Sequence, residues 1–384
     1  MLIAAQPAAH IEPGAIRELP GIVRDTGADA VMIVTDAALA ATPVTGTVTA
    51  VLADAGIQVH VFSGVHPNPT TDDLAAGADA VAEAAGEPDR RIALIAVGGG
   101  SPIDAAKGIA IAAVNPQRGR GLDYRNEFAV PALPIVAVPT TAGTGAETNA
   151  FGVVTDPQTH RKFYVGHATS MPAATILDAE LTVGLPRPVT AATGMDALTH
   201  ALESYLSARP NSWSDGIALQ VIRMVKASLP RAIDDGGDLQ ARSEMLLAAH
   251  MAGVAMASTG LGICHAIGHS LGGRWNIAHG VTLTMVLPDV LRFNLPVRIE
   301  RMAGIAFALG VGDTGADTPR NAAAAIDAVA ELRDRVGLTQ RLSDFGVTEA
   351  DHPRIAADAL DDEVLVNTPR HPTVSDITAI LAAA

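Results

Sequence analysis

The stretch RIALIAVGGGSPIDAAKGIA, Arg91–Ala110, joins an apolar run to a helical pattern through three consecutive glycines. The first part is short and rich in isoleucine, valine and alanine, which is typical of a strand buried on both faces. Ser101 suits a helix N-cap, Pro102 then stands at the first helical position, and Asp104 follows three residues after the cap. The stretch therefore predicts a strand–loop–helix unit of an α/β fold.

The three glycines, Gly98, Gly99 and Gly100, permit the tight turn and close backbone approach that a phosphate group requires. The free N–H groups and the positive dipole end of the following helix would then face an anion. A plain tight turn before a well-capped helix would also explain the glycines. The strand–glycine–helix context favours phosphate binding.

The first half of the chain repeats the alternation of strand and helix, whereas the second half reads as helical from about Thr182 nearly to the end. Alternating strands and helices predict a parallel sheet with crossover helices. A chain of 384 residues is also too long for one ordinary core. We expect an α/β domain over 1–181 and an all-helical domain over 182–384. The other predicted strands are Ala30–Asp36, Ile57–Gly64 and one within Leu133–Gly145.

Composition excludes several functional classes. The formal net charge of −15 and the lack of a lysine or arginine run argue against a nucleic-acid partner. A single cysteine, Cys264, excludes a disulfide framework within the chain and fits a reducing compartment. Neither a signal peptide nor an apolar run of about 18 residues is evident. We expect a cytoplasmic protein without a membrane partner.

A second loop of small hydroxyl residues, VPTTAGTGAE, follows a predicted strand at Val138–Glu147. Thr140, Thr141 and Thr144 could donate to phosphate or ribose, and ligands of open α/β sheets bind outside the carboxyl ends of strands. Asp36 ends an earlier strand, where a carboxylate accepts from the ribose hydroxyls of NAD and repels the 2′-phosphate of NADP. A helix N-cap explains Asp36 equally well.

Histidines and one aspartate form a candidate metal site. Asp196 and His200, in GMDALTHALE, stand four residues apart and share a helix face, as do His265 and His269. His279 follows after an LGG break. An Asp/His pair is half of a plausible divalent-metal site, although an Asp–His hydrogen bond explains the first pair alone. Spacing alone nominates His265 and His269 as the second pair of ligands, and Cys264 points off their face.

The sequence resembles the iron-containing (group III) alcohol dehydrogenase family over nearly its whole length. The resemblance lies in GGGSPIDAAKG, PTTAGTGAE, ATGMDALTHALESYLS, CHAIGHSLGG with the later AHG, and NTPRHPTVSDI. It implies the fold shared with dehydroquinate synthases, in which an N-terminal dinucleotide-binding α/β domain and a C-terminal helical domain enclose a metal in a cleft. It also implies a metal-dependent, NAD-linked alcohol dehydrogenase or aldehyde reductase.

The resemblance assigns roles by motif. It implies that Asp196, His200, His265 and His279 hold the metal, and that His269 lies beside nicotinamide and substrate without binding the metal. His269 then becomes the candidate for a proton relay. Val153 is implied along the same cleft. The expected coenzyme-binding residues are Asp36, Asn68, Gly98, Gly99, Gly100, Ser101, Asp104, Thr140, Thr141, Thr144, Val153 and Lys162.

Three imidazoles and a carboxylate suit Fe²⁺ as well as Zn²⁺, and intrinsic affinity favours zinc. The family name favours iron. Asn149, Phe151 and Met256 fall at positions that line the substrate pocket in relatives, and this apolar lining suggests a small primary alcohol or diol. Arg274, Trp275 and Ala278 depart from common relatives. We expect a homodimer or higher homo-oligomer that acts on a small alcohol or aldehyde.

Related enzymes offer alternatives. A maleylacetate reductase branch dispenses with the metal, and the full Asp/His set argues against it. A glycerol dehydrogenase-like zinc enzyme shares the fold but differs in ligand pattern. Dehydroquinate synthases keep lysine and arginine clusters for their anionic substrate, and this chain has only three lysines, Lys107, Lys162 and Lys226. An NAD-binding protein without catalysis would need a degenerate site, and no expected ligand is missing.

Overall fold

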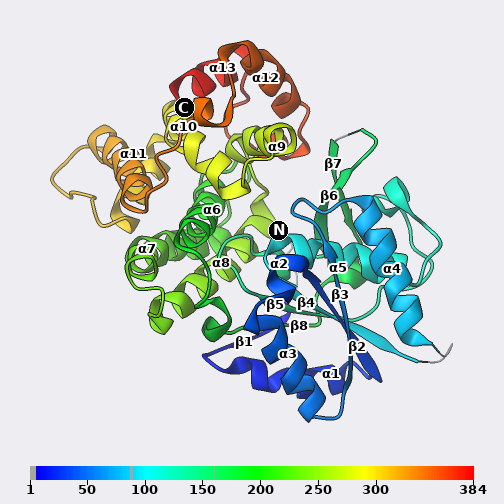
Figure 1. Cartoon of the computed structure of the whole chain (residues 1–384). Helices are drawn as coiled ribbons and strands as arrows, with labels where there is room; N and C mark the ends of the chain where they lie inside the picture. Colours follow the sequence, from blue (N-terminus) through cyan, green and yellow to red (C-terminus); the bar gives the residue numbers. More distant parts are fainter. Residues whose placement is uncertain (1–5, 87–89, 160) are drawn as a thin grey trace. The chain divides into compact units, whose positions relative to one another are not determined.

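The structure is a computed structural model that describes residues 6–86, 90–159 and 161–384 (Figure 1). The described chain divides into two compact units. Of the described residues, the α/β unit contains those from Gln6 to Thr141 and then Gly145–Gly184, and the helical unit contains Ala142–Thr144 and Leu185–Ala384. We expected one boundary, after residue 181. Sequence reasoning did not predict that three residues of the threonine loop, Val138–Glu147, belong to the helical unit.

A six-stranded parallel sheet forms the centre of the α/β unit, with the strand order β1-β8-β5-β4-β2-β3. The prediction of a parallel sheet is confirmed, and its four expected strands are β2, β3, β4 and β5. The outer strand β1 and its neighbour β8 were not predicted. The strands are β1 Ala8–Ile11, β2 Ala30–Asp36, β3 Gln58–Val65, β4 Ile92–Gly98, β5 Ile135–Pro139 and β8 Ala174–Leu177.

Helices bury both faces of the sheet, which explains the continuous apolar runs of the strands. On β4, Ala93, Ile95 and Val97 join a cluster with residues of η1, α1 and α3. The alternate residues of β4 join a second cluster with residues of α4 and α5. The elements on the two faces are η1 Ala15–Glu18, α1 Leu19–Asp25 and α3 Pro43–Asp54, and α4 Thr71–Ala85 and α5 Gly100–Ala112.

An antiparallel hairpin of β6, Phe151–Asp156, and β7, Arg161–Gly166, completes the α/β unit and packs on α5. Sequence reasoning did not predict it. Gly152 of β6 lies so close to α5 that an added Cβ would stand 2.7 Å from the carbonyl oxygen of Asp104. The hairpin is thereby held directly against the helix that follows the three glycines.

The strand order reverses between β2 and β4. From β2 the chain adds β3 on one side, and it then returns to add β4 and β5 on the other. Such a switch point leaves an opening at the carboxyl ends of the two central strands, where open α/β sheets bind their ligands. Asp36 and Gly98 end these two strands. The topology therefore places the candidate coenzyme loop at the expected edge of the sheet.

The helical unit confirms the expectation of a helical second half. Arg298, two residues after Pro296, has non-helical dihedrals, and the long helix α10 kinks there, as prolines within helices commonly cause. In the described chain, no single helix is both long and apolar enough for a membrane span; α8 and α9 together satisfy length and composition but bend by 109°. The helices are α6 Arg187–Leu206, α7 Ser212–Asp234, α8 Leu239–Thr259, α9 Ile263–Trp275, α10 His279–Ala308, α11 Thr318–Arg335, α12 His352–Leu360 and α13 Val374–Ala383.

Candidate functional site

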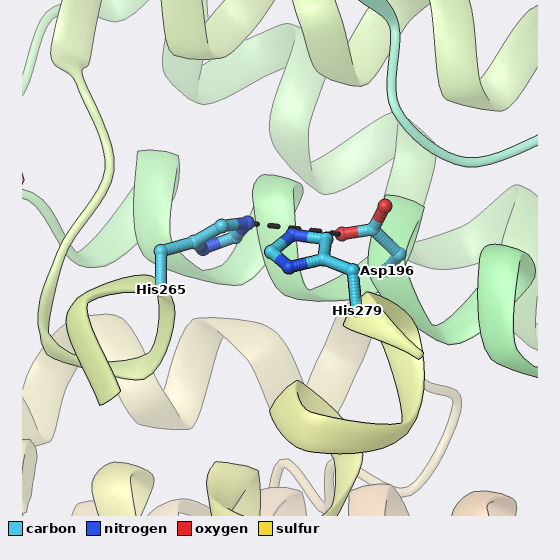
Figure 2. A group of neighbouring side chains, drawn as sticks. All are labelled: Asp196, His265 and His279. Carbon is cyan, nitrogen blue, oxygen red and sulfur yellow. Dashed lines mark ion pairs between the residues drawn. The ribbon is translucent and has the colours of Figure 1, made fainter. Parts of the chain in front are cut away.

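Three helices of the helical unit bring one aspartate and three histidines together. Helix α6 carries Asp196 and His200, α9 carries His265, and His279 is the first residue of α10. The Nε2 atoms of His200, His265 and His279 lie 3.5, 3.7 and 3.8 Å from the same oxygen, Asp196 Oδ1. Figure 2 shows the side chains of Asp196, His265 and His279 pointing toward one another. Their potential ligand atoms all lie within 4.8 Å of one another.

The cluster has the properties of a metal site. Asp196 Oδ1 and His265 Nε2 are buried and have no hydrogen-bond partner in the described chain. Burying such atoms without partners is costly, so a missing ligand is the simplest explanation. Around a tetrahedral ion with bonds of about 2.1 Å, ligand atoms lie roughly 3.4 Å apart. The observed separations from Asp196 Oδ1 are close to this value, and the donors therefore fit a divalent metal.

The electrostatics of the cluster favour a charged carboxylate. Burial alone would raise the pKa of Asp196, but His200, His265 and His279 together hold it well below its usual value. Burial lowers the pKa of His200 and thereby favours the neutral ring that a metal needs. Burial also lowers the pKa of His265, but Glu203 and Asp196 outweigh it and raise that pKa to about 9. A proton on His265 must therefore leave when a metal binds.

His269 lies beside the cluster but points to a different partner. Its Nδ1 is 2.7 Å from Asp362 Oδ2, and its ring stacks on His279 with centroids 5.6 Å apart. The suggestion from spacing alone, that His265 and His269 form a ligand pair, is wrong in this geometry because only His265 faces Asp196. The predicted break at LGG is also wrong, since α9 continues through both glycines to Trp275. Asn276, with φ of 53°, ends the helix instead.

Sequence reasoning missed two acidic residues that contact the histidines. Glu203 accepts a hydrogen bond from His265 Nδ1 at 2.6 Å, and Asp362 pairs with His269. Glu203 could have been found, because it continues the helical spacing of Asp196 and His200 by one turn. Asp362 stands 93 residues after His269, and no local pattern connects them.

Arg274, one of the residues that depart from common relatives, has an ion-pair partner on the segment that also carries Asp362, the partner of His269. Its guanidinium forms an ion pair with Asp358 at 2.5 Å, which joins α9 to α12. Asp358 stands four residues before Asp362, so two carboxylates on one segment engage α9. Nothing in the structure explains Ala278, the residue that precedes α10.

In the α/β unit, the three glycines form a close-packed loop. Gly98 has φ of 150°, its carbonyl oxygen accepts from the Thr140 N–H at 2.9 Å, and a Cβ on Gly99 would stand 3.1 Å from Thr141 Oγ1. The glycine loop and the threonine loop are therefore neighbours. The predicted N-cap is wrong: Gly99 caps α5 and Gly100 begins it, so Ser101 and Pro102 lie inside the first turn. The freedom of the glycine backbone lets the helix begin early.

Asp104 contributes to the packing of the unit and does not cap α5. Its Oδ2 accepts from the N–H of Val153 at 3.0 Å, and its Oδ1 lies 3.8 Å from Lys107 Nζ. Burial raises the pKa of Asp104, and Lys107 opposes that effect. Val153, expected along the coenzyme cleft, thus meets Asp104 through its backbone. A contact of either residue with coenzyme stays a prediction.

Lys107 is fully buried and ties α5 to the segment before β6. Its Nζ donates to the Ala146 carbonyl at 2.7 Å, to Asn149 Oδ1 at 3.1 Å and to the Phe151 carbonyl. Asn149 Oδ1 also accepts from the Phe151 N–H at 2.9 Å. The amide oxygen of Asn149, expected in a substrate pocket, is therefore engaged within its own unit. The Phe151 side chain is exposed and meets Tyr124 edge-on.

The other expected residues are distributed as follows. Asp36 caps the short helix α2, Ala37–Ala40, by accepting from the Leu39 N–H at 2.9 Å, so the N-cap explanation holds without excluding a coenzyme contact. Lys162 donates to Asn68 Oδ1 at 3.0 Å, which brings these two predicted residues together. Thr144 belongs to the helical unit, apart from Thr140 and Thr141. Met256 is half-buried on α8 of the helical unit.

Comparison with known proteins identifies the family. The family model for iron-containing alcohol dehydrogenase matches residues 7–179, and the model for the C-terminal part of the Fe-containing alcohol dehydrogenase family matches residues 190–384. The chain belongs to the iron-containing alcohol dehydrogenase family. The resemblance noted in the sequence is thereby confirmed.

Individual members of the iron-containing alcohol dehydrogenase family match along most of the chain. The NAD-dependent methanol dehydrogenase of Bacillus methanolicus is 36% identical and covers 98% of this chain and 97% of its own length. The 1,3-propanediol dehydrogenase of Klebsiella pneumoniae is 40% identical over 87% of this chain and 85% of its own. The crystal structure of a 1,3-propanediol oxidoreductase superposes with a TM-score of 0.95, at 36% identity and full coverage of both chains.

Membership of the iron-containing alcohol dehydrogenase family confirms several expectations. The fold is the expected one, an α/β part and a helical part. The chain is an NAD-linked oxidoreductase of the alcohol dehydrogenase class. The expectation of NAD with a divalent metal is confirmed at the level of the family. The roles of individual residues stay predictions.

Proposed function

We propose that this chain interconverts a small primary alcohol or diol and its aldehyde, using NAD and a divalent metal, with Fe²⁺ as the working ion. The observation that carries the proposal is the convergence of His200, His265 and His279 on one oxygen of Asp196, at 3.5–3.8 Å. Two of the buried atoms involved have no hydrogen-bond partner in the described chain. A set of three imidazoles and one carboxylate suits iron and also zinc.

In this proposal Asp196, His200, His265 and His279 hold the metal. When bound, the metal supplies Lewis acidity to the alcohol oxygen and NAD accepts the hydride. The helical unit keeps three of these side chains nearly inaccessible to water: Asp196, His200 and His265 are at most 4% exposed, whereas His279 is partly exposed. The less buried His279 leaves the cluster open on its own side, which is where we place the substrate.

His269 is proposed to move the proton of the alcohol. Asp362 is ionised, because His269 lowers its pKa against the effect of burial, and a carboxylate accepts the Nδ1 proton of the ring. Proton exchange with substrate or water then runs through Nε2. The stacking of His269 on His279 places this ring beside the metal ligands. A histidine whose ring is held in one orientation suits general acid–base catalysis.

The α/β unit is proposed to bind NAD at the carboxyl ends of β2 and β4. The first N–H groups of α5 would meet the pyrophosphate, as helix N-termini commonly do. Asp36 can cap α2 with one oxygen and accept from ribose with the other. Asn68 and Lys162, already joined to each other, add polar contacts from α4's N-terminal loop and from β7.

The substrate class follows from chemistry that the relatives share. Methanol and 1,3-propanediol, the substrates named for two relatives, are both small primary alcohols. We propose that Phe151, Asn149 and Met256 line the site for such a substrate. Phe151 is the exposed aromatic of this set, and its apolar ring favours a short carbon chain over a charged substrate.

An alcohol and aldehyde panel tests the proposal. NADH absorbance is followed with C2–C4 primary alcohols, diols and aldehydes, in enzyme treated with a chelator and in enzyme reloaded with Fe²⁺ or Zn²⁺. We expect chelation to abolish turnover and Fe²⁺ to restore it. Full activity in a verified metal-free preparation would contradict the proposal. Activity restored only by Zn²⁺ would contradict iron and keep the reaction class.

We also propose that the enzyme works in the cytoplasm as a homodimer or a higher homo-oligomer. The unpaired, buried Cys264 is consistent with a reducing compartment. Light scattering after size-exclusion chromatography tests the assembly. A particle with the mass of one chain, 39.3 kDa, would contradict it.

A further inference from the structure

Helix α6 presents three acidic or histidine side chains along one buried face. Asp196, His200 and Glu203 stand at helical positions four and three residues apart, so they line up along the same side. All three are at most 8% exposed. The first two are proposed metal ligands, and the third does not reach Asp196 but turns to α9. Glu203 is therefore a buried carboxylate to which the proposed chemistry gives no role.

Glu203 accepts three hydrogen bonds from the start of α9. Its Oε2 accepts from His265 Nδ1 at 2.6 Å and from the Gly262 N–H at 2.9 Å, and its Oε1 accepts from the Cys264 N–H at 2.7 Å. Gly262 is the N-cap residue of α9 and has no side chain to cap the helix. A Cβ on Gly262 would stand 3.1 Å from Glu203 Oε1. Because Gly262 has no side chain, the Glu203 carboxylate of α6 can approach the start of α9.

These contacts decide which nitrogen of His265 carries the proton. A carboxylate only accepts, so His265 Nδ1 must donate, and the neutral ring then keeps its lone pair on Nε2. That nitrogen is the buried atom without a partner in the described chain, 3.7 Å from Asp196 Oδ1. A metal-binding histidine requires this tautomer and commonly donates its other N–H to a carboxylate.

The other buried ligand histidine has a weaker partner. His200 Nδ1 lies 3.3 Å from the backbone carbonyl of Gly143, which carries no charge. His265 Nδ1 instead meets a carboxylate oxygen of Glu203 at 2.6 Å. Each oxygen of Glu203 accepts from a backbone N–H group, an arrangement that suits an ionised carboxylate.

We propose that Glu203 is a positioning residue for the metal centre: its buried carboxylate fixes His265 in the Nδ1–H tautomer and aims Nε2 at the metal. The inference rests on the proposed function, since it assumes that the cluster binds a metal. Glu203 lies outside the proposed ligand set, and the affinity for the metal should nevertheless depend on it.

Cobalt titration tests this role without relying on turnover. Apo-protein is titrated with Co²⁺ in competition with a chelator, and visible absorption reports the ligand field. We expect Glu203→Gln to bind Co²⁺ about 10- to 100-fold more weakly, with altered bands, because outer partners of ligands have effects of this size. Glu203→Asp should recover part of the affinity. Ser204→Ala, a neighbouring buried residue whose hydroxyl accepts from Thr259, is the matched control and should bind like wild type.

The outcomes separate the two proposals. Wild-type protein that fails to bind Co²⁺ would contradict the proposed function. Wild-type binding with an equal affinity and spectrum in Glu203→Gln would overturn the role of Glu203 alone. If Glu203→Gln does not fold, proton NMR of the Co²⁺-loaded wild type decides: we expect a metal-shifted Nδ1–H resonance that exchanges slowly with D₂O. Rapid exchange of every such resonance would overturn the inference.

Discussion

In the helical unit, Asp196 and His265 each keep a buried polar atom without a hydrogen-bond partner in the described chain, whereas in the α/β unit Lys107 finds three oxygen acceptors around it. Both regions bury charge at a cost. In the first, two buried polar atoms stay without a hydrogen-bond partner in the described chain and are available to a ligand. In the second, three oxygen acceptors inside the unit offset part of that cost and connect α5 to Ala146, Asn149 and Phe151.

This difference indicates which kind of contact each region offers to its ligand. A metal centre offers side-chain atoms, and those atoms remain unpaired when the metal is left out. A coenzyme loop offers backbone N–H groups, and the buried side chains near it serve the fold. Substitution in the first region should therefore remove ligand binding with little loss of stability, and substitution in the second should do the reverse.

The largest effect is expected at the metal cluster. His279→Ala should lose the bound metal and lower kcat/KM by about 1,000-fold, because Lewis acidity supplies several kcal/mol to the transition state. Metal analysis and NADH absorbance measure both. His269→Ala is the contrast and should keep its metal. Stoichiometric metal in His279→Ala would contradict the predicted role of the cluster in ligand binding. Destabilisation of the apo-protein as strong as that of a core substitution would contradict the contrast between the two regions.

The Lys107 side chain tests the second region. Lys107→Met should lower the free energy of unfolding by about 3–5 kcal/mol, because buried carbonyl oxygens of Ala146 and Phe151 lose their ammonium donor. Denaturant melts of the apo-protein measure it, and Lys226→Met, on the partly exposed face of α7, is the control. A loss of less than about 1 kcal/mol in the free energy of unfolding would show that the Lys107 ammonium does not stabilise the fold.

The same lysine predicts a dependence on pH. Burial lowers the pKa of Lys107 to about 8 from the usual 10.5, although Asp104 and Glu147 oppose this. Between these values the unfolded chain binds a proton that the folded chain has released, so stability rises with pH across the window. The melting temperature of wild type, relative to Lys107→Met, should therefore increase from pH 8 to 10.5. A flat difference would contradict the lowered pKa.

The proton relay sharpens the comparison within the helical unit. His269→Ala should retain metal and lower kcat by about 100-fold, the lower range for a positioned acid or base. Asp362→Asn should lower it by a smaller factor, since the ring remains but loses its carboxylate. Asp358→Asn breaks the Arg274 ion pair on the same segment and should leave kcat nearly unchanged. Equal losses of kcat in Asp362→Asn and Asp358→Asn would indicate that Asp362 has a purely structural role.

The smallest effect is expected at Asp36. Asp36→Asn keeps a side chain suited to capping α2 but removes the charge that repels the 2′-phosphate of NADP. We expect the preference for NAD over NADP, as a ratio of kcat/KM values, to fall by about tenfold with little change in stability. Asp54→Asn, which changes an exposed residue at the end of α3, should leave the ratio unchanged. An unchanged ratio in Asp36→Asn would limit Asp36 to its role as a cap.

The buried parallel strands were the most predictable part of the fold. Strand β2 was predicted to the residue, because a strand covered on both faces has a continuous apolar run that turn residues delimit. Strands β1 and β8 have four residues each, too few for a pattern to emerge. The cap of α5 was misplaced because Ser101 looks like a better cap than Gly99, and the glycine backbone decided the outcome.

The metal cluster shows what sequence can and cannot give for a site. Helical spacing pairs Asp196 with His200, but it pairs His265 with the wrong partner, because His279 approaches from the start of another helix. Only the family resemblance placed His279 in the set. Asp362 was out of reach, since its relation to His269 exists only in the folded chain.

The short segment Ala142–Thr144 has a consequence for recombining members of this family. These three residues belong to the helical unit, although they lie more than forty residues before the rest of it. Gly143 has room for no side chain, since a Cβ would stand 2.8 Å from the backbone oxygen of Thr193, and its own carbonyl faces His200. A chimera joined at residue 184 would therefore pair one parent's helices with the other parent's loop. If residues 142–144 are exchanged together with Leu185–Ala384, all of these parts of the helical unit come from one parent.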